Sequence, residues 1–151
     1  NDVSGFRDPG MVELAAESDA GCVVMHMRGT PETMMSMTDY GDVVADLTVY
    51  FEERMNQLQQ AGVDRRRIVI DPGIGFAKKR PENLALIRRL SEFASLGRPI
   101  LLGASRKSIL GEITGRGPAA RTHATIASSI LAYLRGVHIL RIHDVAAVAD
   151  A

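Results

Sequence analysis

Ile68-Val69-Ile70-Asp71-Pro72-Gly73-Ile74-Gly75-Phe76 is the stretch of sequence that decides the fold. Its first three residues are β-branched and apolar, which is typical of a strand buried on both faces. The strand ends at a carboxylate, and the two glycines that follow let backbone approach a ligand. We therefore interpret Asp71 as a functional carboxylate. The same residues also fit a turn-capping aspartate, because Asp-Pro-Gly is ordinary turn chemistry.

Apolar runs and amphipathic segments alternate on both sides of this stretch. Besides residues 68–70, short apolar runs predict strands at residues 22–25, 99–102 and 137–142. Apolar residues at helical spacing predict helices at residues 12–19, 42–62, 81–94 and 126–134, with a last helix from Val145. Residues 111–118 contain too much glycine for regular structure.

This order of elements predicts an α/β fold in which helices cover a parallel sheet. A doubly wound open sheet and a (β/α)8 TIM barrel both fit it. Polar residues end several consecutive strands, which favours the barrel, because an open sheet gathers its site at one switch point. These residues are His26, Arg28, Asp71, Ser105, Arg106, Lys107, Arg141, His143 and Asp144. About the last five β/α units are present, so residues 1–151 form one partial domain.

Composition narrows the class of protein. The 151 residues are 46% hydrophobic and 24% charged, and 18 Lys and Arg balance 18 Asp and Glu, so no net charge attracts nucleic acid or a membrane. Cys22 is the only cysteine, and no apolar run is long enough to span a bilayer, so we expect a cytoplasmic protein. The sequence opens at Asn1 without Met, and we expect a fragment cut inside a strand.

The last two strand ends predict an anion site. Barrels commonly bind phosphate with the loops after strands seven and eight, which correspond here to Ser105-Arg106-Lys107 and Arg141-Ile142-His143-Asp144. Strand alternation points Arg141 and His143 the same way, and Asp144 can cap the helix from Val145. The alternative is that Arg141 only pairs with Asp144 and that His143 only packs.

Other motifs do not carry a function. Lys107-Ser108 resembles the end of a phosphate loop, but Arg106 stands where a Walker motif needs glycine. The four histidines form no close ligand pair, so a zinc site held by protein alone is not expected. His138 is interpreted as filler, and residues 34–37, rich in Met, as a loop or packing segment.

Five motifs in one order resemble dihydropteroate synthase. They are Asn1-Asp2-Val3-Ser4-Gly5, Met25-His26-Met27-Arg28-Gly29-Thr30-Pro31, Asp71-Pro72-Gly73-Ile74-Gly75-Phe76, Ser105-Arg106-Lys107-Ser108 and Arg141-Ile142-His143-Asp144. The resemblance implies a folate-pathway transferase on a (β/α)8 barrel. Such an enzyme joins p-aminobenzoate to hydroxymethyl dihydropterin diphosphate and releases pyrophosphate, and sulfonamides compete for its p-aminobenzoate pocket.

The resemblance also implies roles for particular residues. Asn1, Asp71 and Lys107 match residues that hydrogen-bond the pterin ring, which Met25 and Gly103 line. Arg141 and His143 match diphosphate ligands. Phe76 and Ser105 match contacts to p-aminobenzoate, and Arg106 flanks that pocket. The implied catalytic set is Asp71, Lys107, Arg141 and His143. No covalent intermediate is implied, and no nucleophile and base pair is recognised in the sequence.

Departures from the family pattern limit these expectations. The early loop that helps to hold Mg²⁺ is missing, so the expected Mg²⁺ has no protein ligand in this chain, and the fragment alone is expected to be inactive. Ala77 replaces a usual glycine after Phe76, and Ala124-Thr125 stands where the family often has Gly-Thr or Gly-Ser. The implied partners are small-molecule substrates and, for the complete enzyme, a second copy in a homodimer.

Two other functions fit the barrel. One is a pterin-binding methyltransferase module that delivers a folate methyl group to cobalamin, and it needs no diphosphate site. The other is a noncatalytic partner subunit. Arg141 and His143 beside Ser105-Arg106-Lys107 favour the synthase over the first, and the presence of every matched site residue argues against the second.

Overall fold

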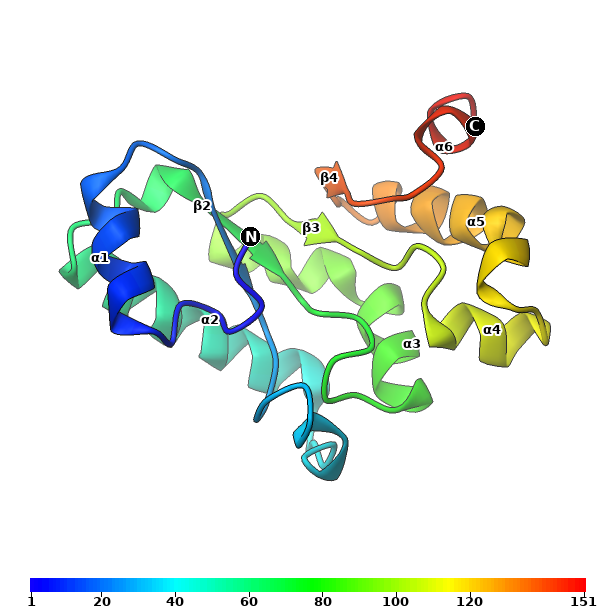
Figure 1. Cartoon of the computed structure of the whole chain (residues 1–151), viewed down its shortest axis with the longest axis horizontal. Helices are drawn as coiled ribbons and strands as arrows, with labels where there is room; N and C mark the ends of the chain where they lie inside the picture. The colour runs from blue at the N-terminus through cyan, green and yellow to red at the C-terminus, as the bar shows by residue number, and fades with distance from the viewer.

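The computed structural model describes all 151 residues and places four short parallel strands side by side in chain order (Figure 1). The strands are β1 (Cys22–Met25), β2 (Ile68–Asp71), β3 (Leu101–Leu102) and β4 (Ile139–Leu140). The α-helices are α1 (Pro9–Glu17), α2 (Val43–Gln60), α3 (Arg80–Arg88), α4 (Ser108–Thr114), α5 (Thr122–Tyr133) and α6 (Val145–Ala149). Short 3-10 helices are η1 (Met34–Ser36), η2 (Arg65–Arg67), η3 (Leu90–Leu96) and η4 (Pro118–Ala120).

Strand pairing follows the order of the chain. β1 pairs with β2 and β3 with β4, both parallel, and a parallel bridge between Ile70 and Ile100 connects the two pairs. A second parallel bridge joins Asp2 to Val24 and sets the N-terminal segment beside β1. The predicted α/β class with parallel strands is confirmed. The strands lie in chain order without a reversal, so the sheet lacks the switch point of a doubly wound sheet.

The strands bury one face more completely than the other. Val24 and Ile70 are fully buried, whereas their neighbours Val23 and Val69 are only half-buried. On β4, Ile139 is 41% exposed. Since successive side chains of a strand point to opposite faces, one face carries the core and the other is partly open. The buried face shares its core with Leu47, Phe51, Met55, Leu86, Leu90 and Phe93.

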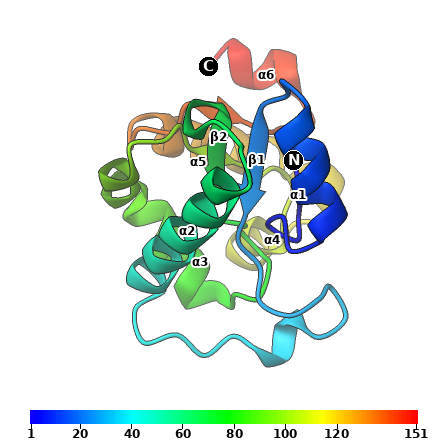
Figure 2. The same cartoon turned by 90° about the vertical axis from the view of Figure 1, so that its left-hand side faces the viewer.

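Figure 1 shows α2 and α3 below the strands, with α5 and α6 beyond β4 toward the C-terminus. Figure 2 shows α1 beside β1, and both views show residues 26–42 extending away from the strands before α2 begins. No helix is long and apolar enough to cross a membrane.

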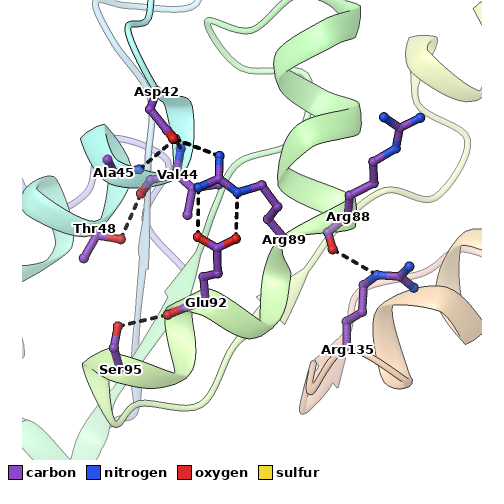
Figure 3. A network of polar contacts seen from close by, with 9 residues as sticks. All are labelled: Asp42, Val44, Ala45, Thr48, Arg88, Arg89, Glu92, Ser95 and Arg135. Carbon is purple, nitrogen blue, oxygen red and sulfur yellow. Dashed lines mark hydrogen bonds and ion pairs between the residues drawn. The ribbon is translucent and has the colours of Figure 1, made fainter.

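The predicted helix at residues 42–62 is confirmed as α2. Asp42 caps it, because its Oδ1 accepts hydrogen bonds from the backbone N–H groups of Val44 (2.8 Å) and Ala45 (3.2 Å). Figure 3 shows that Arg89 reaches the same carboxylate, at 2.9 Å from Nη1 to Oδ2, while its Nε contacts Glu92 at 2.7 Å. Arg89 thus joins the start of α2 to η3.

Asp42→Ala should lower the free energy of unfolding by about 1 kcal/mol, the usual effect of losing such a cap. The surface ion pair with Arg89 adds little. Urea denaturation measures the change, and most of it should persist in 1 M salt, because salt screens the ion pair and the helix dipole but leaves the capping hydrogen bonds in place. Asp39→Ala is the matched control, since that exposed side chain makes no hydrogen bond. Equal stability of the two variants would contradict the capping role.

The predicted helix at residues 81–94 is wrong in its second half. α3 ends at Arg88, Arg89 leaves the helical conformation with φ −112° and ψ 18°, and the chain continues as the 3-10 helix η3. Leu90, Phe93 and Leu96 recur every third residue and are all buried. A 3-10 helix has three residues per turn, so it places all three side chains on one face, which an α-helix would not.

The prediction of irregular structure for residues 111–118 is also wrong in part. α4 runs from Ser108 to Thr114 and includes Gly111. A Cβ at Gly111 would lie 2.1 Å from Arg121 Nη2, so this glycine makes room for the guanidinium. Buried Ile109 and Leu110 anchor the helix, and its packing outweighs the weak helix propensity of glycine.

The remaining predicted elements are confirmed with shifted ends. α1 begins at Pro9 and ends at Glu17, α5 begins at Thr122, and α6 begins at Val145 as expected. The predicted strands at residues 99–102 and 137–142 each reduce to two paired residues. Their outer residues still bond: the N–H of His138 donates to Ile100 O at 2.9 Å and that of Arg141 to Leu102 O at 3.0 Å.

Candidate functional site

Asp71 ends β2 with its side chain almost fully buried, at 1% exposure. Oδ1 accepts a hydrogen bond from the N–H of Gly73 at 2.8 Å. Oδ2 has no hydrogen-bond partner and lies 3.7 Å from Arg141 Nη2. Burial raises the pKa of Asp71, and the Gly73 hydrogen bond and the charges of Arg141 and Lys107 partly offset this. A buried acceptor without a hydrogen-bond partner is costly, so a donor from a ligand at this position would be favourable.

Strand register sets Asp71 on the face opposite the core. Met25 pairs with Asp71 one step beyond the core-facing pair Val24 and Ile70. In the same way Gly103 and Arg141 follow the core-facing pair Leu102 and Leu140. Since side chains alternate along strands, Met25, Asp71, Gly103 and Arg141 all belong to the open face, where the first three are buried and Arg141 is exposed. A Cβ on Gly103 would lie 2.6 Å from Arg141 Nη2, so the glycine leaves room for this guanidinium.

The loop after Asp71 follows a left-handed path at three positions. Gly73 has φ +65°, Gly75 φ +80° and Ala77 φ +51°. A Cβ on Gly73 would lie 2.2 Å from His26 O, so only glycine fits there. Ala77 adopts a conformation that favours glycine, at a cost of about 1 kcal/mol. The replacement of glycine at position 77 therefore stores strain in this loop.

Lys107 brings the third strand-end loop to the same place. Its Nζ lies 4.2 Å from the centroid of the Phe76 ring and donates a hydrogen bond to Ile74 O. Burial lowers the pKa of Lys107 to about 8, although the charge of Asp71 acts in the opposite direction. Lys107 therefore contacts the loop that carries Asp71 and Phe76, as a cation over an aromatic face.

A small cavity lies beside Lys107. It is lined by Gly103, Ser105, Lys107, Arg141, Ile142 and His143. Lys107 and Arg141 give it positive charge, and no carboxylate lines it. The predicted convergence of Arg141 and His143 with the Ser105-Lys107 segment is therefore present, in a form suited to an anion. The alternative in which Arg141 only pairs with Asp144 is wrong, because Arg141 reaches Asp71 instead.

Ser105 and His143 form a pair that the sequence did not indicate. Ser105 Oγ lies 2.8 Å from His143 Nδ1 and accepts from the backbone N–H of His143 at 3.2 Å. The hydroxyl can act as donor or acceptor toward Nδ1, and in either case the two contacts fix the orientation of the His143 ring. The expectation of no nucleophile and base pair is thus wrong in geometry: the two residues are 38 positions apart, which no local motif reveals.

Asp144 does not cap α6, contrary to the prediction. No side-chain hydrogen bond is made at that helix start. Asp144 Oδ1 instead accepts from Arg106 Nη2 at 2.6 Å, and Thr122 Oγ1 lies 3.3 Å from Oδ2. The guanidinium is a charged donor and competes well with backbone N–H groups. Asp144 thereby holds the Arg106 guanidinium near α6. Arg106 does not line the cavity, although its neighbours Ser105 and Lys107 do.

Known proteins resemble the chain over nearly its whole length. A family model described as pterin binding enzyme matches residues 1–143. The chain belongs to the pterin-binding enzyme family. Dihydropteroate synthase from Escherichia coli K12 is 38% identical over 151 residues, which is all of this chain and 54% of that protein. The chain thus spans about half the length of the curated relatives it matches.

Solved structures of dihydropteroate synthases have a fold similar to that of this chain. Dihydropteroate synthase from Thermus thermophilus in complex with 6HMPPP has a TM-score of 0.94 at 45% identity, over 99% of this chain and 60% of that one. The Xanthomonas albilineans enzyme in complex with 7,8-dihydropteroate has a TM-score of 0.90 at 40% identity, over 99% and 56%.

Asn1 is the predicted site residue with the least support from contacts. It is exposed, and its side chain makes no hydrogen bond. The bridge between Asp2 and Val24 sets Asn1 level with Val23, on the open face of the sheet. It therefore shares a face with Met25 and Asp71 but does not join their hydrogen-bond network.

Three residues of the site region were missed in the sequence. Lys78 is buried and its Nζ bonds to the loop after β2, while Asn83 accepts from the N–H of Gly75 at 2.8 Å. Thr125 Oγ1 accepts from the N–H of Arg106 at 3.2 Å. A lysine only two residues after Phe76 in a glycine-rich loop was a usable signal for Lys78. Thr125 was named only as part of the Ala124-Thr125 departure from the family pattern, and nothing in the sequence indicated its contact with Arg106.

No group of three or more His, Cys, Asp or Glu residues is arranged to hold a metal ion. The cavity beside Lys107 is lined by two cationic side chains and no carboxylate. Hard divalent cations such as Mg²⁺ prefer carboxylate and carbonyl oxygens. These residues therefore do not fit a Mg²⁺ site by themselves, and no chemical step is assigned to the metal.

Proposed function

We propose that residues 1–151 provide the pterin and diphosphate site of a dihydropteroate synthase. The complete enzyme would condense p-aminobenzoate with hydroxymethyl dihydropterin diphosphate and release pyrophosphate. The observation that carries the proposal is the buried, unpartnered Oδ2 of Asp71, which lies 3.7 Å from Arg141 on the open face of the sheet. Relatives bound to 6HMPPP and to 7,8-dihydropteroate support this choice of ligands.

The pterin ring would bind over the open face between β1, β2 and β3. Asp71 would accept two hydrogen bonds from the amino-pyrimidine edge, which would satisfy Oδ2. Lys107 would donate to the carbonyl side of the ring, and Met25 and Gly103 would line its faces. Asn1 would approach from the neighbouring edge. All of these residues except Lys107 belong to the open face by register or bridge.

The diphosphate would bind in the cationic cavity. Arg141 can offer two parallel N–H donors, and His143, whose ring Ser105 holds through Nδ1, lines the same cavity. Phe76 and Ser105 would contact p-aminobenzoate, flanked by Arg106, whose guanidinium is held by Asp144. Sulfonamides would compete with p-aminobenzoate for that pocket.

The catalytic contribution of these residues is electrostatic. The C–O bond to diphosphate breaks while Arg141 and His143 stabilise the departing charge, and the carboxylate of Asp71 stabilises the positive charge that develops on the pterin. The amine of p-aminobenzoate then forms the C–N bond and loses a proton to solvent. Ser105 orients His143, and no protein nucleophile is required, because the amine forms the C–N bond directly.

The strands support a (β/α)8 barrel as the architecture of the complete enzyme. Parallel pairing in chain order, with no reversal, fits about five consecutive units of a barrel wall. Residues 1–151 would then be one partial pterin-binding domain. Site residues at the carboxyl ends of β1 to β4 fit the usual active face of a barrel. Mg²⁺ would take ligands outside residues 1–151. A homodimer is proposed from the family resemblance alone, and a cytoplasmic location from the single cysteine and the lack of a long apolar run.

A methyl-transfer module that binds a folate remains the second candidate. It would use the same pterin carboxylate, Asp71, but has no use for a diphosphate site. The cavity lined by Arg141, His143 and Lys107 favours the synthase. A noncatalytic subunit is disfavoured because the buried acceptor of Asp71 and this cavity are both in place.

Release of pyrophosphate on mixing the two substrates tests the proposal. We expect release from a chain extended to the length of its relatives, and none from the 151-residue chain, which still binds the pterin diphosphate in calorimetry. Pterin binding without pyrophosphate release by the extended chain would support the methyl-transfer module. No binding of pterin by either chain would overturn the proposed site.

A further inference from the structure

Lys78 is a buried lysine with no direct carboxylate partner. Only 2% of it is exposed, and its Nζ lies close to four acceptors. They are Phe76 O at 2.8 Å, His26 Nδ1 at 2.9 Å, Gly73 O at 3.1 Å and His26 O at 3.4 Å. Burying an amine in this way is unfavourable unless its donors are all used. Three backbone carbonyl groups and the His26 ring accept from Nζ, although burial still lowers the pKa of Lys78 to about 7.

These acceptors come from the ends of two neighbouring strands. His26 follows β1, and Gly73 and Phe76 lie in the loop after β2. The left-handed residues of that loop curl it, so that the carbonyl groups of Gly73 and Phe76 both reach one nitrogen. Lys78 Nζ therefore ties the loop of Asp71 and Phe76 to the end of β1.

The tie reaches Asp71 through one residue. Gly73 donates its N–H to Asp71 Oδ1 at 2.8 Å and accepts from Lys78 Nζ through its carbonyl oxygen. The charge of Lys78 also helps to lower the pKa of Asp71. On the other side, burial and then the charge of Lys78 lower the pKa of His26 to about 2, so its imidazole is neutral and Nδ1 is free to accept.

Other side chains hold the same loop from the helix side. Asn83 accepts from the N–H of Gly75 at 2.8 Å and donates to Lys78 O at 3.1 Å, and Tyr40 donates to Ala77 O at 2.9 Å. Neither of them contacts His26 by a hydrogen bond. Lys78 is thus the side chain that connects the loop to β1, and Asn83 provides an internal comparison.

We propose that Lys78 is a positioning residue, whose amine fixes the Asp71–Phe76 loop against the end of β1 and so sets the place of Asp71 and Phe76 without contacting the ligand. The inference rests on the proposed function for the identity of that ligand. The arrangement of the loop can be measured without ligand, so that part of the inference does not depend on the proposed function.

Lys78→Met removes the amine and keeps most of the side-chain length. Without ligand, amide hydrogen exchange should become at least tenfold faster at Gly73 and Phe76, and less so at Gly75, which Asn83 still holds. The pKa of Asp71, followed by carboxyl ¹³C shifts, should rise. In the extended chain the affinity for a pterin diphosphate should fall about tenfold or more. Lys79→Met, at an exposed neighbour with no side-chain hydrogen bond, should change none of these.

A chemical rescue separates the amine from the fold. Lys78→Cys in a Cys22→Ala background is alkylated while unfolded, with bromoethylamine or with iodopropane, and then refolded. The two side chains have the same length and differ only in a terminal ammonium or methyl group. The aminoethyl form should recover slow exchange at Gly73 and Phe76, and the propyl form should not, or should fail to refold.

Equal exchange and equal Asp71 titration in the two alkylated forms would overturn the proposal, as would refolding of neither form. If the wild-type extended chain binds no pterin diphosphate, the proposed function fails. The ligand-free exchange and titration still decide the role of Lys78 in that case.

Discussion

Replacement of Asp71 by asparagine should weaken binding of a pterin diphosphate about 100-fold or more and leave the chain folded. Asparagine can still accept from the N–H of Gly73, but an amide N–H₂ then stands where the unpartnered Oδ2 faces Arg141. Hydrogen bonds to a charged group contribute about 1.5–3 kcal/mol each, and about 1.4 kcal/mol is tenfold in affinity. Calorimetry on the extended chain measures the loss.

The same substitution should stabilise the chain at neutral pH. Burial raises the pKa of Asp71 above its ordinary value of 3.8, so the folded state holds a proton more tightly than the unfolded state. The stability that this proton provides is complete below pH 3.8 and is lost as pH rises through the higher folded pKa. Asparagine has no proton to lose, so its advantage should grow over that window and persist at pH 7.

Urea denaturation from pH 4 to pH 8 checks this sign. Asp42→Asn is the control, because asparagine caps a helix as well as aspartate does and position 42 lies away from the cavity. That variant should bind the pterin diphosphate normally. Unchanged affinity in a folded Asp71→Asn chain would overturn the ligand role of Asp71. A loss of relative stability between pH 4 and pH 7 would overturn the account of its burial.

Arg141→Met should lower the affinity for inorganic pyrophosphate about 100-fold. The guanidinium is the side chain of the cavity that can bind two phosphate oxygens at once, and methionine keeps only its apolar length. Affinity for a pterin without diphosphate should change little. The pKa of Asp71 should rise further, because the charge of Arg141 lowers it. Competition calorimetry and carboxyl ¹³C titration measure the two effects.

Arg135→Met is the matched control for this experiment. Arg135 donates to the backbone oxygens of Arg88 and Leu131 and does not line the cavity (Figure 3 shows its contact with Arg88). It has the same formal charge, so its loss tests whether net charge alone attracts the anion. Equal loss of pyrophosphate affinity in the two variants would remove Arg141 as a specific ligand.

Elements with a strong period could be predicted from the sequence, and elements shaped by distant partners could not. α2 carries apolar residues at helical spacing and a capping aspartate, so both its ends were close to prediction. Arg89, directly after the end of α3, pairs with Asp42, 47 positions away, and Gly111 leaves room for Arg121, which lies beyond the end of α4. Local spacing contains no record of such contacts.

The candidate site divides in the same way. Asp71 was identified because it ends an apolar strand, and register then places it with Met25, Gly103 and Arg141. Pairs that form across the site were out of reach: Ser105 with His143 lies 38 positions apart, and so does Arg106 with Asp144. The predicted capping role of Asp144 was wrong for that reason. Asp144 pairs with Arg106, a charged residue far from it in the sequence, and not with the backbone of α6.

The left-handed loop after β2 bears on how this site can evolve. Positive φ angles at Gly73, Gly75 and Ala77 set the path of the loop, and a Cβ at Gly73 would lie 2.2 Å from His26 O. Substitutions at Phe76 can therefore change the side chain that contacts a ligand while the backbone at position 76 stays in the same place. The ligand preference of residue 76 and its position in the loop can therefore change separately, so a new ligand preference does not require a change in the turn.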